Sequence, residues 1–159
     1  MRHYFRLFPA LLISLLLVSC ATTEKPVWDE NMADETGSYK YAAWRPDGSG
    51  QYEAINVLLK EADELIAEQQ LNAASDKLER VLRIKPEYAP AWSRLSWLAL
   101  QMKSPERAVQ MAKRSNSFAQ ADPELQSLNE SFIRAASKAL NDEDSDFRAK
   151  QNIDTLKVF

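Results

Sequence analysis

Cys20 is the residue of this sequence best suited to covalent chemistry. It is the only cysteine among 159 residues, and its thiolate is a strong nucleophile near neutral pH. It follows a basic start, with Arg2 and Arg6, and an apolar stretch over residues 7–18 that is too short to cross a bilayer. Such a stretch has the length of the apolar core of a signal peptide. We therefore predict that residues 1–19 are removed and that Cys20 begins the mature chain.

The residues before Cys20 indicate what is attached to it. The sequence Leu17-Val18-Ser19-Cys20 resembles the lipobox of bacterial lipoprotein precursors, in which the cysteine accepts a diacylglyceryl group as a thioether. Several acyl chains hold a protein stably at a membrane, whereas one chain alone holds it marginally. Ala21, in place of aspartate, implies by resemblance to lipoprotein sorting signals that the protein is delivered to the outer membrane. The alternative is a secreted protein with one unpaired cysteine.

Few other residues could carry catalysis. The only histidine, His3, lies in the predicted signal peptide, and no pattern typical of serine or zinc hydrolases occurs. The acidic run over residues 142–146 lacks the spacing and the glycine of a calcium-binding loop, so we interpret it as part of a polar C-terminal tail over residues 141–159. We therefore expect no enzyme activity, no cofactor and no metal site.

The charge of the chain argues against nucleic acid as a partner. The formal net charge is −3, and removal of Arg2 and Arg6 leaves 18 basic and 23 acidic residues, a charge of −5. Nucleic-acid phosphates require clustered lysine and arginine, which this sequence does not have. We expect a protein partner instead.

The mature chain divides into a tether and a helical domain. All three glycines precede residue 51, and residues 20–50 are polar and contain Pro26 and Pro46, which predicts a flexible tether with the lipidated cysteine at its start. Fully extended, this segment would reach about 100 Å at roughly 3.3 Å per residue. Residues 51–140 contain no glycine and are rich in strong helix formers, so we expect them to form one helical domain.

Apolar residues at spacings of three and four predict five helices in this domain. Two of them are expected to begin at Ser104 and Asp122, because each is followed by proline and glutamate, the pattern of an N-cap, a first-position proline and an acid in the first turn. The last helix is expected to cap the array. The expected ranges are 52–69, 73–84, 88–102, a helix from 104 through 112, and 122–140.

The spacing within these helices repeats. Leu58, Leu65 and Ala74 are followed, 34 residues later, by Trp92, Ala99 and Ala108. This spacing resembles that of the tetratricopeptide repeat, in which a small residue lets the second helix of each pair approach the first. The sequence departs from the family at three positions, where Ala62 and Ser96 replace a glycine and Gln120 replaces a proline. The resemblance predicts an all-α, short tetratricopeptide-repeat stack; a plain helical bundle is the alternative.

The resemblance also implies a concave groove lined by the first helix of each pair. We expect Trp97 to be the main contact for a partner, because an indole offers a large apolar face and one N–H donor. The alternative is that Trp97 packs against the tether or the fifth helix. We also expect the aromatic residues Tyr39, Tyr41, Trp44 and Tyr52 to pack onto the domain, although they could form a second contact for a partner. The groove residues expected to bind a partner are Leu59, Asp63, Ile66, Ser93, Trp97, Leu100 and Gln101.

The combination of lipobox, tether and short array resembles the small tetratricopeptide outer-membrane lipoproteins that activate class A penicillin-binding proteins. The resemblance implies a lipid-anchored interaction module on the periplasmic face of the outer membrane, near peptidoglycan, whose partner is a bifunctional class A penicillin-binding protein that it activates allosterically. The alternative is a pilotin-like assembly factor for a secretin or pilus component of the outer membrane.

Overall fold

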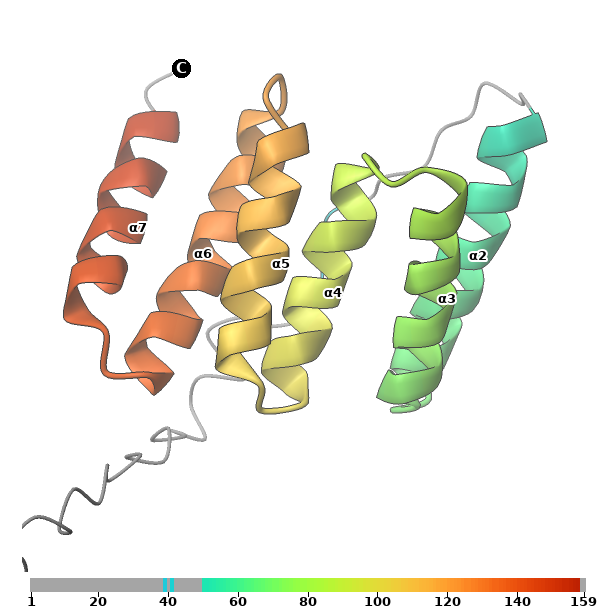
Figure 1. Ribbon diagram of the computed structural model, residues 1–159, viewed down its shortest axis with the longest axis horizontal. Helices are drawn as coiled ribbons and strands as arrows, with labels where there is room; N and C mark the ends of the chain where they lie inside the picture. The colour runs from blue at the N-terminus through green and yellow to red at the C-terminus, as the bar shows by residue number, and fades with distance from the viewer. Residues whose placement is uncertain (1–38, 40, 42–49, 158–159) are drawn as a thin grey trace, which may run out of the picture.

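The computed structural model describes Tyr39, Tyr41 and residues 50–157. In this part of the chain all regular structure is helical and there are no strands. The predicted signal peptide, Cys20 and most of the tether lie outside the described residues. The helices are α2 (Gly50–Ala67), α3 (Leu71–Ile84), α4 (Ala89–Gln101), α5 (Pro105–Phe118), α6 (Pro123–Ala139) and α7 (Glu143–Leu156) (Figure 1).

The helices form a row of three hairpins in chain order (Figure 1). α2 pairs with α3, α4 with α5 and α6 with α7, while α3 packs against α4 and α5 against α6. α4 also packs directly against α6, so the first helices of the second and third hairpins are neighbours. The predicted all-α stack of paired helices is therefore confirmed.

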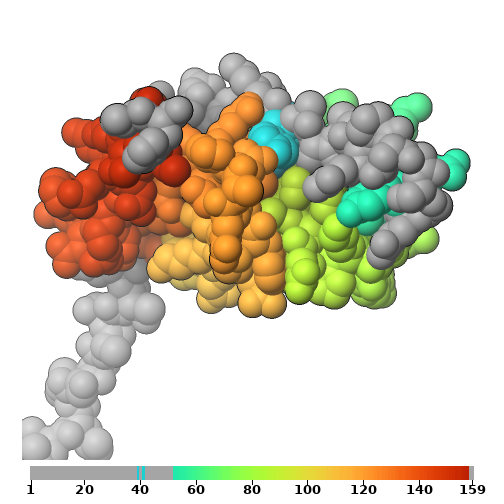
Figure 2. Space-filling model, turned by 90° about the horizontal axis from the view of Figure 1, so that it is seen from above, coloured from blue at the N-terminus to red at the C-terminus, as the bar shows by residue number. Residues whose placement is uncertain are grey.

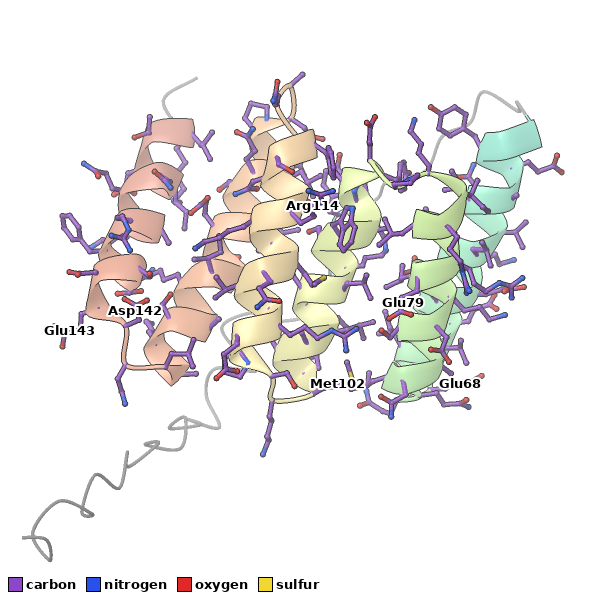
Figure 3. The ribbon with its side chains drawn as sticks, viewed as in Figure 1. Glu68, Glu79, Met102, Arg114, Asp142 and Glu143 are labelled. Atoms are coloured by element: carbon purple, nitrogen blue, oxygen red, sulfur yellow. The ribbon has the colours of Figure 1, made fainter. Side chains whose placement is uncertain are left out.

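The prediction of a polar tail was wrong for residues 143–156, which form α7, a sixth described helix. Asp142 begins this helix, because its carboxylate accepts a hydrogen bond from the backbone N–H of Ser145 at 3.0 Å. Asp142 and Glu143 lie at the N-terminal end of α7 (Figure 3). The acidic run is thus the N-terminal turn of a helix, where negative charge is favourable.

A narrow apolar stripe holds α7 against the rest of the stack. Ala149 is 1% exposed, and Ile153 and Leu156 lie half-buried four and seven residues further on. The rest of the helix is polar and Phe147 is exposed, so the helical periodicity of the sequence is weak here. The helix over residues 123–139 does not cap the array, since α7 packs along it.

Small residues allow the helices of each hairpin to approach closely. Ala74 and Ala108, the two small residues 34 positions apart, have no exposed surface. Ser96, which stands where the repeat family has glycine, is also fully buried, and its hydroxyl donates to the carbonyl oxygen of Ala108 at 2.8 Å. The larger side chain is accommodated because its polar atom finds a partner in the opposite helix.

The turn inside each hairpin has the same geometry. Gln69, Lys103 and Asn141 have φ angles of 61°, 57° and 55°, in the left-handed region. In each turn, the N–H of the next residue bonds to the carbonyl five residues before it, at 2.8–2.9 Å. The three matching turns identify α6 and α7 as a third hairpin of the same kind.

None of the described helices is long and apolar enough to cross a bilayer.

The left-handed turns predict that glycine is favourable at Lys103. Because a non-glycine residue in this region is sterically disfavoured, Lys103→Gly should raise the free energy of unfolding by up to about 1 kcal/mol. Lys113→Gly, the control, places glycine in the interior of α5 and should lower it by about 1 kcal/mol. Chemical denaturation measures both. Equal destabilisation by the two changes would contradict the turn geometry.

Candidate functional site

The seven predicted groove residues lie on the first helices of two neighbouring hairpins. Three of them belong to α2 and four to α4. Asp63, Ile66 and Gln101 keep part of their surface exposed. The buried members are Leu59, Ser93, Trp97 and Leu100. The surface that α2 and α4 present, called here the groove face, is therefore largely covered.

Tyr39 covers the centre of the groove face. Its ring centroid lies 6.5 Å from that of Trp97 on α4, with the rings at 67°, and 6.2 Å from that of Phe132 on α6. Trp97 is consequently only 6% exposed. Trp97 thus packs against Tyr39 of the tether, which is the alternative that the sequence left open to an exposed contact for a partner. The expectation that Tyr39 and Tyr41 pack onto the domain is confirmed, whereas Trp44 lies outside the described residues.

A buried arginine forms the floor beneath Tyr39. Arg94 is 2% exposed, and its guanidinium carbon lies 4.6 Å from the centroid of the Tyr39 ring. The same guanidinium donates two hydrogen bonds to Asp63 on α2, from Nε at 3.2 Å and from Nη2 at 3.4 Å. Arg94 could not be recognised from the repeat pattern, because this position is not among the groove positions of the repeat. Asp63, a carboxylate on a face that becomes buried, was the signal that a cation lay nearby.

Three buried polar atoms gather around Tyr39: its own hydroxyl, the Ser93 hydroxyl and Nη1 of Arg94. The two hydroxyls face each other closely enough for a hydrogen bond from Ser93 to lower the pKa of Tyr39, whereas Nη1 of Arg94 has no hydrogen-bond partner. A buried donor without a partner destabilises the structure by about 1–3 kcal/mol. The ring contacts of Tyr39 are therefore partly offset by this unpaired donor.

Tyr41 binds the start of α6. Its hydroxyl donates to Oδ2 of Asp122, whose Oδ1 accepts from the backbone N–H of Leu125 at 2.9 Å. Its ring packs near the buried residues Ala89 and Leu125. The Asp122 carboxylate thus caps the N-terminus of α6 and also binds Tyr41 of the tether. We call Tyr39 and Tyr41 the tyrosine pair.

Burial changes the acidity of the tyrosine pair. It raises the pKa of Tyr39 from 10.0 to about 12, against the opposing effect of the nearby Arg94 guanidinium. The pKa of Tyr41 is raised as well, by burial first and then by the hydrogen bond to Asp122. Both phenols are therefore neutral at any physiological pH.

An open hollow continues the groove face beyond Tyr41. It has a volume of about 630 Å³ and mixes apolar side chains, two serine hydroxyls and three charged groups. Arg134 in its wall is held by Asp146, with Nε 3.0 Å from Oδ1. The lining residues are Tyr41, Pro123, Glu124, Ser127, Leu128, Ser131, Arg134, Ile153, Leu156 and Lys157. Because Tyr41 is one of these residues, the hollow borders the tyrosine pair.

The hollow uses the groove positions of the third hairpin. α4 begins at Ala89 and α6 at Pro123, 34 residues later. Residues 93, 97 and 100 of the predicted groove correspond by this spacing to Ser127, Ser131 and Arg134, which line the hollow. These three residues were not predicted as groove residues, because the helix that carries them was expected to cap the array. Extending the 34-residue count by one repeat would have found them.

A second hollow of about 480 Å³ lies between α2 and α3 at the beginning of the stack. Val57 and Ile84 border it and are 52% and 36% exposed. Ala91 and Leu125, which lie 34 and 68 residues after Val57, are buried, because a preceding hairpin packs against them. The second hollow marks the end of the stack rather than the groove.

The fold and the groove define a class of protein. A family model described as Tetratricopeptide repeat matches residues 65–130, and the three hairpins with their repeated turns form a short stack of this kind. Such stacks present extended surfaces that bind other proteins. No curated protein matches the sequence.

One solved structure relates the chain to a particular protein. The globular C-terminal domain of P. aeruginosa LpoP is similar to it, with a TM-score of 0.60 and 26% identical residues. The match covers 71% of this chain and 99% of that chain. The chain is therefore similar to LpoP, and its helical stack resembles a short tetratricopeptide-repeat array.

The raised pKa of Tyr39 predicts how the tyrosine pair responds to pH. The buried site favours the neutral phenol, so this stabilisation is complete below pH 10 and is lost as the pH rises through about 12. Ultraviolet absorbance of tyrosinate should show a late step near pH 12 that Tyr39→Phe removes, while the still later ionisation of Tyr41 remains. A Tyr39→Phe titration identical to that of the unchanged chain would show that the Tyr39 hydroxyl is not shielded from solvent.

Proposed function

We propose that this chain is a lipid-anchored periplasmic module that activates a class A penicillin-binding protein, a bifunctional peptidoglycan synthase. The observation that carries the proposal is the similarity to the LpoP domain, which extends over 99% of that domain. The resemblance of residues 17–20 to a lipobox supports attachment to the outer membrane. The module contributes binding rather than catalysis.

The hollow beside Tyr41 is the surface that we assign to the synthase. It lies at groove positions of the third hairpin and stays open, whereas the tyrosine pair covers the corresponding positions of α4. Its apolar residues, Leu128, Ile153 and Leu156, offer area for burial, and its serines and charged groups offer directional contacts. These are the properties of a surface that binds a folded protein or one of its segments.

Activation by such a module is a shift between states of the synthase. A bound protein changes the activity of its partner only if it binds the active conformation more tightly than the inactive one. The stack suits this role because the hollow is lined by residues of α6 and α7, two helices that pack together along their length. Lipid attachment would supply the module at the membrane that faces the peptidoglycan layer.

A single arginine in the hollow should abolish activation. Ser131→Arg places a bulky cation in the hollow and removes only a hydroxyl that bonds within α6, to the carbonyl of Leu128 at 2.6 Å. The dissociation constant for the synthase should rise about tenfold or more, with a matching loss of glycan-strand synthesis. Ser117→Arg is the matched control, because Ser117 is exposed on α5 and its hydroxyl makes the same kind of bond, to Arg114 at 2.7 Å.

The measurements are synthase binding and glycan synthesis with purified proteins. Unchanged activation by Ser131→Arg would exclude the hollow as the docking surface. A chain that has no effect on any class A synthase, and that instead recovers a secretin from envelope extracts, would contradict the proposed function itself.

Cys20→Ser tests the membrane attachment separately. Without the thiol there is no thioether to form, so the variant should leave the outer-membrane fraction and keep its signal peptide or be processed elsewhere. Membrane fractionation and the mass of the mature protein measure this. A variant with unchanged fractionation and mass would show that Cys20 carries no lipid.

A further inference from the structure

The groove face already holds a segment of its own chain, and this complex shows what the groove can bind. We infer that the groove face is a receptor for an extended peptide segment with two aromatic residues separated by one residue. The chain's own tyrosine pair fills it, and a segment of the partner fills it by exchange. The inference rests on the proposed function only in taking the partner to be a protein.

The first subsite is an aromatic cage around Tyr39. Trp97 meets the ring edge to face, Phe132 lies against it at 31°, and the Arg94 guanidinium lies 4.6 Å from its centroid. These three side chains come from α4 and α6, two helices that pack directly together. An aromatic ring in this cage contacts Trp97 and Phe132 through its face and edge. The Arg94 guanidinium favours a ring with an electron-rich face.

The second subsite selects a hydroxyl. The Tyr41 hydroxyl donates to the Asp122 carboxylate, and the ring packs near the small residues Ala89 and Ala119 and near Leu125. Side chains two residues apart point to the same side of an extended segment. A tyrosine at the second position, with any aromatic residue at the first, therefore matches the two subsites.

The complex with the chain's own segment leaves one buried donor unpaired. Nη1 of Arg94 is buried beside Tyr39 and has no acceptor. A segment that brings a carbonyl or carboxylate oxygen to this place would accept a hydrogen bond from it and would bind more tightly than the tyrosine pair. Exchange can begin at the second subsite, because Tyr41 is only partly buried and lines the open hollow.

The test uses the full mature chain and a fluorescein-labelled peptide with the sequence of residues 36–43, TGSYKYAA. In the unchanged chain the tyrosine pair competes at an effective concentration of about millimolar. A chain with Tyr39→Ala and Tyr41→Ala has vacant subsites. Fluorescence anisotropy should give this chain a dissociation constant for the peptide that is lower than that of the unchanged chain by about tenfold or more. A peptide with both tyrosines replaced by alanine should not bind either chain.

Two further variants keep the test decisive. Tyr41→Phe retains the ring and loses only the bond to Asp122, so it should fold and should bind the peptide more tightly than the unchanged chain. Asp122→Asn in the chain with vacant subsites should weaken the peptide severalfold, because its remaining oxygen still begins α6 while the carboxylate is lost. Asp142→Asn is the matched control, since Asp142 begins α7 in the same way and binds no tyrosine.

The inference is wrong if the vacant chain and Tyr41→Phe bind the peptide no better than the unchanged chain, or if the alanine peptide binds equally well. These outcomes leave the proposed function intact, because they involve no synthase. If the vacant chain binds the peptide but the protein activates no synthase, the inference about the groove stands and the proposed function is wrong.

Discussion

The ion pair between Arg94 and Asp63 is the interaction on which the groove depends. Removing a guanidinium from water is costly by several kcal/mol, so a cation that is 2% exposed needs a carboxylate partner. Asp63 supplies it from the neighbouring helix while remaining 40% exposed. The pair ties α2 to α4 across the groove face, and its planar cation is the surface on which Tyr39 lies. Without Asp63, the floor of the groove would hold an unpaired buried charge.

The third hairpin depends on a second polar interaction, deep between α5 and α6. Asn129 is fully buried and donates to Ser115 at 2.8 Å and to Asn116 at 2.7 Å. Asn116 in turn bonds Glu130 at 2.7 Å, and Asn152 of α7 bonds the other oxygen of that carboxylate at 3.2 Å. Burial raises the pKa of Glu130. These directional bonds set the position of α6, and with it the hollow that we assign to the partner.

Local patterns predicted the stack well, because helix starts and paired packing are encoded within a few residues. Pro105 and Pro123 begin helices as expected, although the Ser104 hydroxyl bonds Met102 instead of capping α5. α7 escaped prediction because only Ala149, Ile153 and Leu156 form its apolar stripe. The state of Trp97 could not be derived from repeat positions, since the residue that covers it comes from outside the array. Non-local contacts of this kind leave no periodic signal in a sequence.

The position of Tyr39 has a consequence for distance. If Cys20 holds the lipid, only 18 residues separate the membrane from the point where the chain grips its own helices, against 29 before Gly50. At roughly 3.3 Å per residue the shorter span reaches about 60 Å and the longer about 100 Å. Docked tyrosines thus make the free tether shorter by about two fifths. The same two side chains that occupy a binding surface also determine how far from the lipid layer that surface can travel.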